Sequence, residues 1–236
     1  MPRSIFKSNI QRILLYTRRK GDGFIYKSGS SVIKTSFIVN PNYKNEYNIL
    51  TELNHPHIIK IKDAYYEPNR FNIKFPYYPN GDLREGKTLN RTLNKNEILD
   101  TTMKLVKPIV YAHKRGIIHL DIKLENYLED DKNNFILIDF EFAKKFNKAY
   151  YDTSELRHIV GTPSYVAPEI KNLIYGPTSD IYSLGKMIYL IITRRFPDTL
   201  DIDWRPITFY VPELENILVS MLQNNYKYRP TIYEVH

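Results

Sequence analysis

A short stretch that sets charged residues among apolar ones constrains this chain more than any other feature. The segment IIHLDIKLENYL, residues 117–128, places Asp121, Lys123 and Asn126 between side chains that favour burial. A buried charge is costly unless it is paired or hydrogen-bonded. The segment therefore predicts a loop whose apolar residues anchor it in a folded lobe and whose polar groups are held in place for chemistry.

The composition is that of a chain with a substantial core. It has 236 residues, 42% of them apolar, with 20 Tyr and 11 Phe, which suffices for one large core or two small lobes. There is no cysteine, which excludes disulfides and thiolate zinc sites. The net charge of +8 favours an acidic partner such as a nucleotide, an acidic protein or anionic lipid, although solubility alone explains it equally well.

The sequence shows neither a membrane span nor a secretion signal. The longest apolar run, around 187–192, is too short to cross a bilayer, and the start of the chain has basic residues on both sides of a short apolar patch. We therefore expect no membrane span, and a location in the cytoplasm or in the cytosol or nucleus of a host cell.

The hydrophobic pattern changes near residue 80. Before it, alternating or β-branched runs predict strands, and helical spacing predicts one helix. The predicted strands are Arg12–Thr17, Phe24–Lys27, Ser31–Ile38, Ile58–Tyr66 and Phe71–Tyr77, and the predicted helix is Tyr43–Leu53. After it, helical patterns cover Asn96–Arg115, Ser179–Thr193 and Pro212–Asn224. The expected fold class is α+β, with a small β-rich lobe joined to a larger, mostly helical one.

A second segment completes the predicted site. The apolar strand 135–138 delivers Asp139 to its exposed end, thirteen residues after Asn126. A hairpin with its turn at 130–134 can bring Asn126 and Asp139 together as oxygen ligands for Mg²⁺ beside phosphate groups. Asp121 could then accept a proton from an attacking hydroxyl, while Lys123 neutralises charge on the phosphoryl group. This set predicts phosphoryl transfer.

Eight segments that follow one another along the chain resemble motifs of the protein kinase family. HLDIKLEN is similar to the catalytic loop, IDFEFA to the metal-binding segment, and GTPSYVAPE, residues 161–169, to the substrate-facing loop. The other five are VIK with Lys34, NEYNILTELNHPHII with Glu46, YYPNGDL, SDIYSLGKMIY with Asp180, and YRPT with Arg229. The resemblance implies a single kinase domain over residues 1–236, with a small lobe of about 1–76, a connector at about 76–80 and a large lobe of about 81–236.

The same resemblance implies an ATP site between the lobes. Lys34 would hold the α and β phosphates of ATP and pair with Glu46. Backbone groups of Pro76 and Tyr78 in the connector would bind adenine. The remaining implied contacts are Phe75 behind the adenine, Asp82 near the ribose, and Gly21 and Gly23 in the loop over the phosphates.

Several residues are implied to be structural. Asp180 would brace the catalytic loop, and Glu169 would form a buried ion pair with Arg229. Loss of one partner of such a pair costs about 3–5 kcal/mol, so these residues would affect folding as well as chemistry. His119 is implied to pack and hydrogen-bond in support of the loop rather than to act as a base.

The type of acceptor is suggested by two features. Lys123 and the loop GTPSYVAPE resemble the serine/threonine branch of the family, and Thr162 is expected to hydrogen-bond near Asp121 and Lys123. The expected substrate is therefore a Ser or Thr hydroxyl of a protein, and nucleic acid is not an expected partner.

Leu120 and Glu141 depart from the family pattern. Leu120 replaces the Arg that in many kinases binds a phosphorylated activation loop, so activity is expected not to depend on phosphorylation of Thr153 or Ser154. Glu141 stands in place of a Gly after Asp139-Phe140. It either locks this segment in one state or adds a third carboxylate near the metals.

The glycine-rich loop is also incomplete. In GDGFIYKSG, Tyr26 stands where a third Gly would fall. The segment is therefore either a weak cover over the phosphates or simply a hairpin turn at Asp22-Gly23.

The carboxyl side of the large lobe is shorter than in most of the family. About a dozen residues separate RRFPD from VPELENILVSML, where an extra docking helix is common, and the final helix must be short or missing. Substrate choice is then expected to depend on a regulatory or host protein partner or on basic residues of the chain. The candidates are Arg18, Arg19, Lys20, Lys144, Lys145 and Lys148, and a solvated surface charge is an alternative explanation for each.

Functions of different classes are compatible with these features. An active serine/threonine kinase is favoured because Lys34, Glu46, Asp121, Lys123, Asn126 and Asp139 are all present. A pseudokinase or decoy that binds nucleotide or a partner kinase without turnover is the alternative that the incomplete glycine loop and Glu141 suggest. The string IDFE also resembles aminoglycoside phosphotransferases and choline kinases, but those lack the Ala-Pro-Glu loop and the SDIYSLG helix start.

Overall fold

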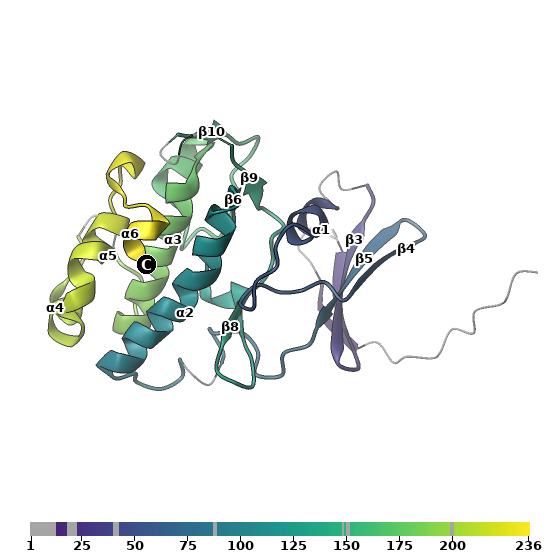
Figure 1. Ribbon diagram of the computed structural model, residues 1–236, viewed down its shortest axis with the longest axis horizontal. Coiled ribbons are helices and arrows are strands. Elements are labelled where there is room, and N and C mark those ends of the chain that lie inside the picture. The colour runs from purple at the N-terminus through teal and green to yellow at the C-terminus, as the bar shows by residue number, and fades with distance from the viewer. Residues whose placement is uncertain are drawn as a thin grey trace, which may run out of the picture.

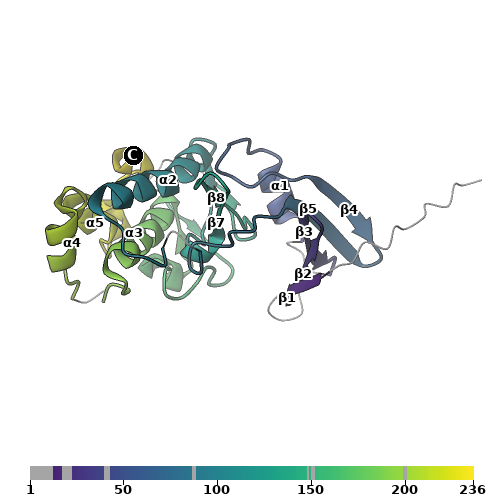
Figure 2. The ribbon, with the colours of Figure 1, turned by 90° about the horizontal axis from the view of Figure 1, so that it is seen from below.

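The fold is seen in a computed structural model that describes residues 13–17, 23–39, 43–86, 89–147, 149, 152–198 and 201–236. A five-stranded sheet and one short helix form a small lobe, and the other helices form a larger lobe (Figure 1). Figure 2, a view turned by 90°, shows the same separation of the two lobes. The predicted α+β, two-lobed fold is confirmed.

The small lobe is built on one antiparallel sheet. Its strands are β1 (Ile13–Thr17), β2 (Gly23–Ser28), β3 (Ser31–Phe37), β4 (Asp63–Glu67) and β5 (Arg70–Pro76), in the order β1-β2-β3-β5-β4. Within β3, Lys34 lies opposite Ile25 of β2 and Ile73 of β5. Because side chains alternate along a strand, this register turns the Lys34 side chain toward the helix α1 (Asn45–Leu50), where it meets Glu46.

Helix α1 is shorter than the predicted Tyr43–Leu53 but keeps its amphipathic pattern. Ile49 and Leu50 are buried against the main core, while Asn48 is exposed. The helix has only six residues and no side-chain cap at its start. Since so short a helix is marginal by itself, packing of its apolar face must hold it in place.

The predicted strand Ile58–Tyr66 is wrong in its first half, because β4 begins only at Asp63. Residues 57–59 pair with the large lobe instead. The N–H of Ile59 donates to the carbonyl of Leu137 at 3.0 Å, and the N–H of Leu137 donates to the carbonyl of His57 at 2.9 Å. Ile58 and Ile59 are therefore buried by contact between the lobes, which a strand pattern in the sequence cannot distinguish from burial within one sheet.

The predicted helices of the large lobe are present with shifted ends. The helix α2 (Lys95–His113) begins at a capping box formed by Asn94 and Glu97, and α3 (Pro177–Thr193) is almost entirely buried. The third prediction, Pro212–Asn224, is replaced by the 3-10 turn η4 (Pro212–Leu214) and the helix α5 (Glu215–Met221). The helix α4 (Arg205–Tyr210) was not predicted, and α6 (Ile232–Val235) has only four residues.

The large lobe also contains several short strands and 3-10 turns. The strands β6 (Ile117–Ile118) and β9 (Lys144–Lys145) pair, as do β7 (Tyr127–Glu129) with β8 (Phe135–Leu137) and β10 (Ser154–Glu155) with β11 (Ile174–Tyr175). The 3-10 turns are η2 (Leu124–Asn126), η3 (Pro168–Asn172) and η5 (Tyr226–Tyr228). The β7–β8 hairpin is the one that the sequence predicts with its turn at 130–134.

One apolar core runs through both lobes, from Ile49 and Ile73 to Leu105 and Leu184. A second cluster lies around the loop that follows β6 and includes Ile118 and Leu120. Among the described residues, no helix has both the length and the apolar character that a membrane span requires.

Candidate active site

The loop between β6 and η2 is shaped by one carboxylate from α3. Asp180 accepts hydrogen bonds from the backbone N–H groups of His119 and Leu120, both at 2.8 Å. Leu120 has a φ of 66°, an unfavourable conformation for a branched side chain. The two bonds to Asp180 stabilise this bend, so the predicted bracing contact is present.

Asp180 is itself fully paired. Its Oδ2 lies 2.9 Å from Nε2 of His113 in α2, and both side chains are 1% exposed. Burial opposes the negative charge, but the hydrogen bond and attraction from His113 and the backbone hydrogen bond from His119 outweigh it and hold the pKa of Asp180 below its usual value. The loop thus rests on an ionised, buried carboxylate.

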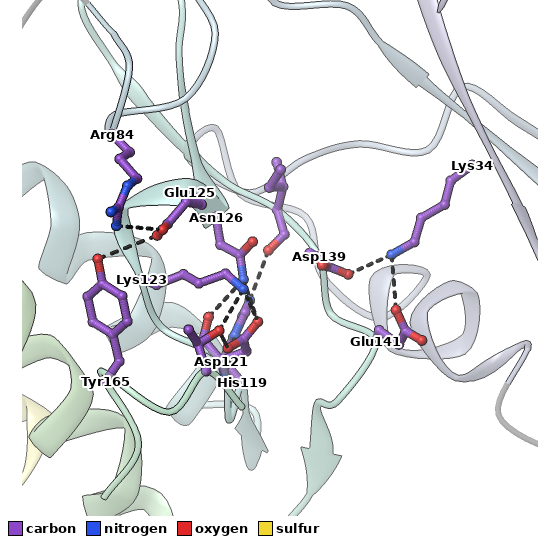
Figure 3. Close-up of polar contacts among 12 residues, drawn as sticks. Lys34, Arg84, His119, Asp121, Lys123, Glu125, Asn126, Asp139, Glu141 and Tyr165 are labelled. Atoms are coloured by element: carbon purple, nitrogen blue, oxygen red, sulfur yellow. Dashed lines mark hydrogen bonds and ion pairs between the residues drawn. The ribbon is translucent and has the colours of Figure 1, made fainter. Parts of the chain in front are cut away.

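The carboxylate of Asp121 lies at the centre of a closed set of contacts (Figure 3). Its Oδ2 lies 2.7 Å from Nζ of Lys123 and accepts a bond from Asn126 Nδ2 at 3.1 Å. Its Oδ1 accepts a bond from the Thr162 hydroxyl at 2.8 Å, and Lys123 donates to the same hydroxyl at 2.8 Å. Asp121 is 5% exposed, so its orientation is fixed.

The β7–β8 hairpin brings Asn126 next to Asp139, as the spacing predicts. The N–H of Ile138 donates to the Asn126 carbonyl at 2.9 Å, and Asp139 follows directly with a φ of 62°. The recorded side-chain bonds of Asn126 are made by Nδ2, at 2.8 Å to the Asp121 carbonyl and at 3.1 Å to its carboxylate. The amide oxygen of Asn126 and the carboxylate of Asp139, which also pairs with Lys34, are oxygen ligands of the kind that a hard cation such as Mg²⁺ prefers.

His119 supports the Asp139 segment. The N–H of Asp121 donates to its Nδ1 at 3.2 Å, so the ring carries its proton on Nε2, which lies 3.0 Å from the Ile138 carbonyl. The ring also packs against Phe140, with centroids 4.7 Å apart. Both nitrogens of His119 are thus engaged in structure, as the resemblance implies.

Lys34 lies among three carboxylates. Its Nζ is 2.7 Å from Glu46, 2.5 Å from Asp139 and 3.6 Å from Glu141. Burial is the main effect that raises the pKa of Glu46, and the charges of Asp139 and Glu141 raise it further against the opposing effect of Lys34. The predicted Lys34–Glu46 pair is present, and Glu141 joins it from the position that usually holds Gly.

The helix α1 is also bonded to the Asp139 segment through the main chain. The N–H of Phe140 donates to Glu46 Oε1 at 3.2 Å, and Asn45 Nδ2 donates to the carbonyls of Glu141 and Ala143 at 2.8 and 3.0 Å. Phe140 is fully buried. These contacts hold Glu46, Lys34 and Asp139 in one arrangement.

The residues expected around adenine lie at the end of β5. Phe75 is buried, Pro76 is the last residue of the strand, and Tyr78 is partly buried. Asp82 Oδ1 accepts bonds from the N–H groups of Arg84 and Glu85 at 2.9 and 3.2 Å. Its carboxylate therefore caps a turn at the start of the large lobe, a role that the sequence interpretation did not include.

Of the two predicted loop glycines, Gly21 lies outside the described residues. Gly23 begins β2 with a φ of 151°, and a Cβ placed there would lie 1.8 Å from the Thr35 carbonyl oxygen. This close approach of two strands accounts for a glycine at position 23 by packing. Tyr26 lies within β2, so the β1–β2 connection comprises only residues 18–22, which the structure does not describe.

Leu120, at the position where the resemblance implies an Arg, is packed among apolar side chains. It is 6% exposed and belongs to the second apolar cluster, with Phe146, Val160 and Tyr182 among its members. The other predicted structural pair is present as well, because Arg229 binds Glu169 through two contacts of 2.6 and 2.8 Å. These contacts stabilise the large lobe around the loop.

Sequence reasoning missed one contact at the edge of the site. Glu125 binds Arg84 at 2.9 Å and accepts a weaker bond from the Tyr165 hydroxyl at 3.4 Å (Figure 3). Arg84 lies 41 residues before Glu125. No local pattern could have paired them. Of the basic candidates for partner contacts, Lys145 pairs with Glu52 at 2.6 Å, whereas Arg18, Arg19, Lys20 and Lys148 lie outside the described residues.

Comparison with known proteins agrees with this geometry. The family model described as "Protein kinase domain" matches residues 25–236. The chain is 32% identical over 156 residues to NUAK family SNF1-like kinase 1 of Homo sapiens, which covers 65% of this chain and 23% of that protein. It is 31% identical over 172 residues to CBL-interacting serine/threonine-protein kinase 1 of Arabidopsis thaliana, covering 70% of this chain and 38% of that protein.

A longer match is found to the Hormonally up-regulated neu tumor-associated kinase homolog B of Xenopus laevis, 27% identical over 216 residues, or 85% of this chain and 34% of that protein. The chain thus corresponds to between 23% and 38% of the length of these three relatives. Together, the two-lobed fold, the family model and the kinase relatives place this chain in the eukaryotic-type serine/threonine protein kinase family.

Proposed function

We propose that this chain transfers the γ-phosphoryl group of ATP to a Ser or Thr hydroxyl of a protein substrate. The observation that carries the proposal is the arrangement around Asp121, where one buried carboxylate is oriented by Lys123, Thr162 and Asn126 at 2.7 to 3.1 Å. A carboxylate held in this way, next to a cation and two oxygen ligands for a metal, suits a reaction that depends on positioning and electrostatics.

In the proposed reaction, Asp121 accepts the hydroxyl proton as the substrate oxygen forms its bond to the γ phosphorus. The bond between that phosphorus and the bridging oxygen breaks, ADP leaves, and the proton later passes from Asp121 to solvent. Lys123, 2.7 Å from Asp121, neutralises charge on the phosphoryl group during transfer. Asn126 and Asp139 supply oxygen ligands for Mg²⁺, which would offset the charge of the phosphates.

We assign nucleotide binding to the region where the two lobes meet, between Lys34 and the end of β5. Lys34 would exchange part of its contact with Asp139 and Glu141 for the α and β phosphates, while Glu46 keeps it in place. Backbone groups of Pro76 and Tyr78 would receive adenine against Phe75. Asp82 stays a predicted ribose contact, and Gly23 a predicted neighbour of the phosphates.

The test is transfer of labelled γ-phosphate from Mg-ATP to the protein itself or to model Ser/Thr proteins. The variants Asp121→Ala and Asp121→Asn are expected to reduce transfer by about 1,000-fold, because they remove the base. Asp203→Asn, a change at an exposed carboxylate paired with Arg205, is the matched control and should leave transfer unchanged. Equal transfer by the wild type and Asp121→Ala would reject the proposal.

A second candidate is nucleotide binding without transfer, and the observation that favours it is the third carboxylate at Lys34. Glu141 lies 3.6 Å from the Lys34 ammonium and competes for the same charge as a phosphate group. This function predicts a rise in melting temperature with Mg-ATP but no labelled product. Glu141→Gly would then restore transfer, whereas in an active enzyme it changes transfer little.

We also propose a cellular location and a kind of protein partner. A cytoplasmic location, or the cytosol or nucleus of a host cell, and a regulatory or host protein partner follow from the family and the sequence rather than from any contact in the structure. A tagged chain followed by microscopy, and a pull-down that compares wild type with Asp121→Asn, would test both points.

A further inference from the structure

One buried lysine of the large lobe is not used by the proposed reaction. Lys186 lies in α3, a helix whose other residues from Pro177 to Tyr189 are also buried, and it is 8% exposed. Its ammonium lies 5.7 Å from the ring centre of Tyr182 and 6.0 Å from that of Phe196. Aromatic faces of this kind attract a cation but do not neutralise it.

In the part of the chain that the structure describes, Lys186 has no carboxylate within ion-pair distance and no hydrogen-bond acceptor for its ammonium. Two other buried charges of the lobe, by contrast, are in ion pairs: Asp180 with His113 and Arg229 with Glu169. Burial lowers the pKa of Lys186, and the nearby charge of exposed Lys171 lowers it further. A buried cation without an anion is costly, so this position favours binding of a negative group.

The ammonium of Lys186 is not sealed from solvent. The Lys186 residue keeps 8% of its surface exposed. Phe196, whose ring it approaches, is 36% exposed. A ligand group from outside can therefore reach Lys186 along the edge of Phe196.

Contacts connect this position to the predicted substrate-facing loop. The Phe196 ring packs against Tyr165 with centroids 5.0 Å apart, and the Ser183 hydroxyl donates to the Tyr165 carbonyl at 3.0 Å. Tyr165 belongs to the same loop as Thr162, which binds Asp121. Pro163 and Ser164, between them, are exposed. Lys186 thus lies behind a short loop whose front borders the proposed catalytic base.

Glu125, an acidic residue of η2 that contacts this loop through Tyr165, is already neutralised. Glu125 is paired with Arg84 at 2.9 Å and with the Tyr165 hydroxyl at 3.4 Å (Figure 3). Lys186 and the nearby Lys171 add two positive charges behind this loop. The local field therefore favours an acidic peptide over a basic one.

We propose that Lys186, assisted by Lys171, binds a carboxylate side chain of the protein substrate close to the Ser or Thr that accepts the phosphoryl group. This inference rests on the proposed kinase function and adds a substrate class, acidic Ser/Thr sequences. Lys186 is a specificity residue here and takes no part in the transfer itself.

The experiment compares peptides that contain one Ser and differ only in a Glu or a Gln placed at each nearby position in turn. The wild type is expected to prefer Glu at one position by about 10-fold or more in kcat/KM, since a desolvated charge pair discriminates strongly. Lys186→Met should abolish this preference and leave transfer to the Gln peptide unchanged. Lys186→Arg should keep most of the preference, and Lys171→Gln should lower it slightly.

Lys107→Met, a change at an exposed lysine on α2, is the matched control and should keep the full preference. Equal transfer to the Glu and Gln peptides by the wild type, or a preference that survives in Lys186→Met, would overturn the subsite while leaving the proposed function intact. If the wild type transfers no phosphate at all, the same peptides carrying a fluorophore are tested for binding. Selective binding of the Glu peptide that Lys186→Met abolishes supports the subsite without turnover, and equal binding rejects it.

Discussion

Two charged groups of the candidate site, Lys34 in the small lobe and Asp121 in the large lobe, are held by different kinds of contact. Lys34 is fixed by ion pairs to three carboxylates, of which Asp139 and Glu141 have side chains 33% and 24% exposed. Asp121 sits on a loop whose backbone is bonded to the buried Asp180. The first arrangement depends on charge balance and the second on buried, directional bonds.

This difference indicates which half of the site is formed in advance. Hydrogen bonds from buried backbone groups leave the loop around Asp121 a single conformation. The ion pairs of Lys34 can exchange partners, because phosphate oxygens can replace carboxylates at the same ammonium. We therefore expect the large-lobe half to be rigid and the small-lobe half to reorganise on nucleotide binding.

The largest effect should follow from breaking the support of the loop. Asp180→Ala leaves two buried N–H groups and the His113 ring without their acceptor, and should lower the free energy of unfolding by about 3–5 kcal/mol. Urea denaturation measures this change. Asp203→Ala, at an exposed carboxylate bound to Arg205, is the control and should change stability little. An Asp180→Ala protein as stable as the control would show that the loop is held by other contacts.

A smaller effect on stability is expected when Lys34, in the small-lobe half of the candidate site, is replaced. Lys34→Met should change the free energy of unfolding by about 1 kcal/mol or less, because Glu46 can take up a proton and the two other carboxylates are reached by water. Phosphoryl transfer should nevertheless fall by about 100-fold or more. The comparison fails if Lys34→Met destabilises the fold as strongly as Asp180→Ala.

Glu46, which pairs with Lys34, and Asp180, which supports the Asp121 loop, should also differ in how their contributions to stability depend on pH. Burial raises the pKa of Glu46 above its usual 4.5, so its contribution to stability is complete below pH 4.5 and is lost as pH rises through the raised pKa. The stability of the wild type relative to Glu46→Gln should therefore decrease as pH rises above 4.5. The pKa of Asp180 is depressed, so its contribution to stability changes with pH in the opposite direction. That contribution is lost only as pH falls below the usual value of 3.8.

Urea titrations of wild type and Glu46→Gln across this pH range measure the first trend, and acid unfolding of the wild type measures the second. A stability difference between wild type and Glu46→Gln that grows with pH would show that Lys34 keeps Glu46 ionised despite its burial.

The smallest expected effect concerns the loop after β9. A Thr153→Ala, Ser154→Ala double variant should retain wild-type activity, because Leu120 is packed in an apolar cluster and offers no charge to a phosphate group. Initial rates of transfer to a model protein give the comparison. A large loss of activity in the double variant would mean that another basic residue binds a phosphorylated loop.

Much of the site could be predicted from the sequence because its residues lie in short contiguous stretches. Asp121, Lys123 and Asn126 belong to one loop, and Asp139 follows at a spacing that fits one hairpin, so local geometry already places them together. Lys34 and Glu46 required the family resemblance. Nothing in the local pattern of β3 or α1 says that these two side chains face each other.

The strand that was predicted wrongly, and the helix and contacts that were not predicted, have physical causes that a single sequence does not reveal. Ile58 and Ile59 show a strand pattern, but they are buried against Leu137 of the other lobe. The short helix α4 is packed through Ile207 rather than through a long periodic stripe, so no window of the sequence signals it. The pairing of Arg84 with Glu125 depends on tertiary contact, as does the burial of Lys186 beside Tyr182 and Phe196.

The backbone bonds between residues 57–59 and Leu137 give the lobes a second point of attachment beyond the covalent connector at 76–80. A rotation of the lobes that preserves these two attachments must turn about the axis that joins them, and it loosens the bonds of α1 to residues 140–143. Leu137 lies on this axis and Asp139 is only two residues away, whereas the tip of the sheet around Phe24 is remote from it. If the lobes move apart about this axis, the tip of the sheet moves away from the proposed nucleotide site, while Asp139, a proposed metal ligand, stays almost stationary.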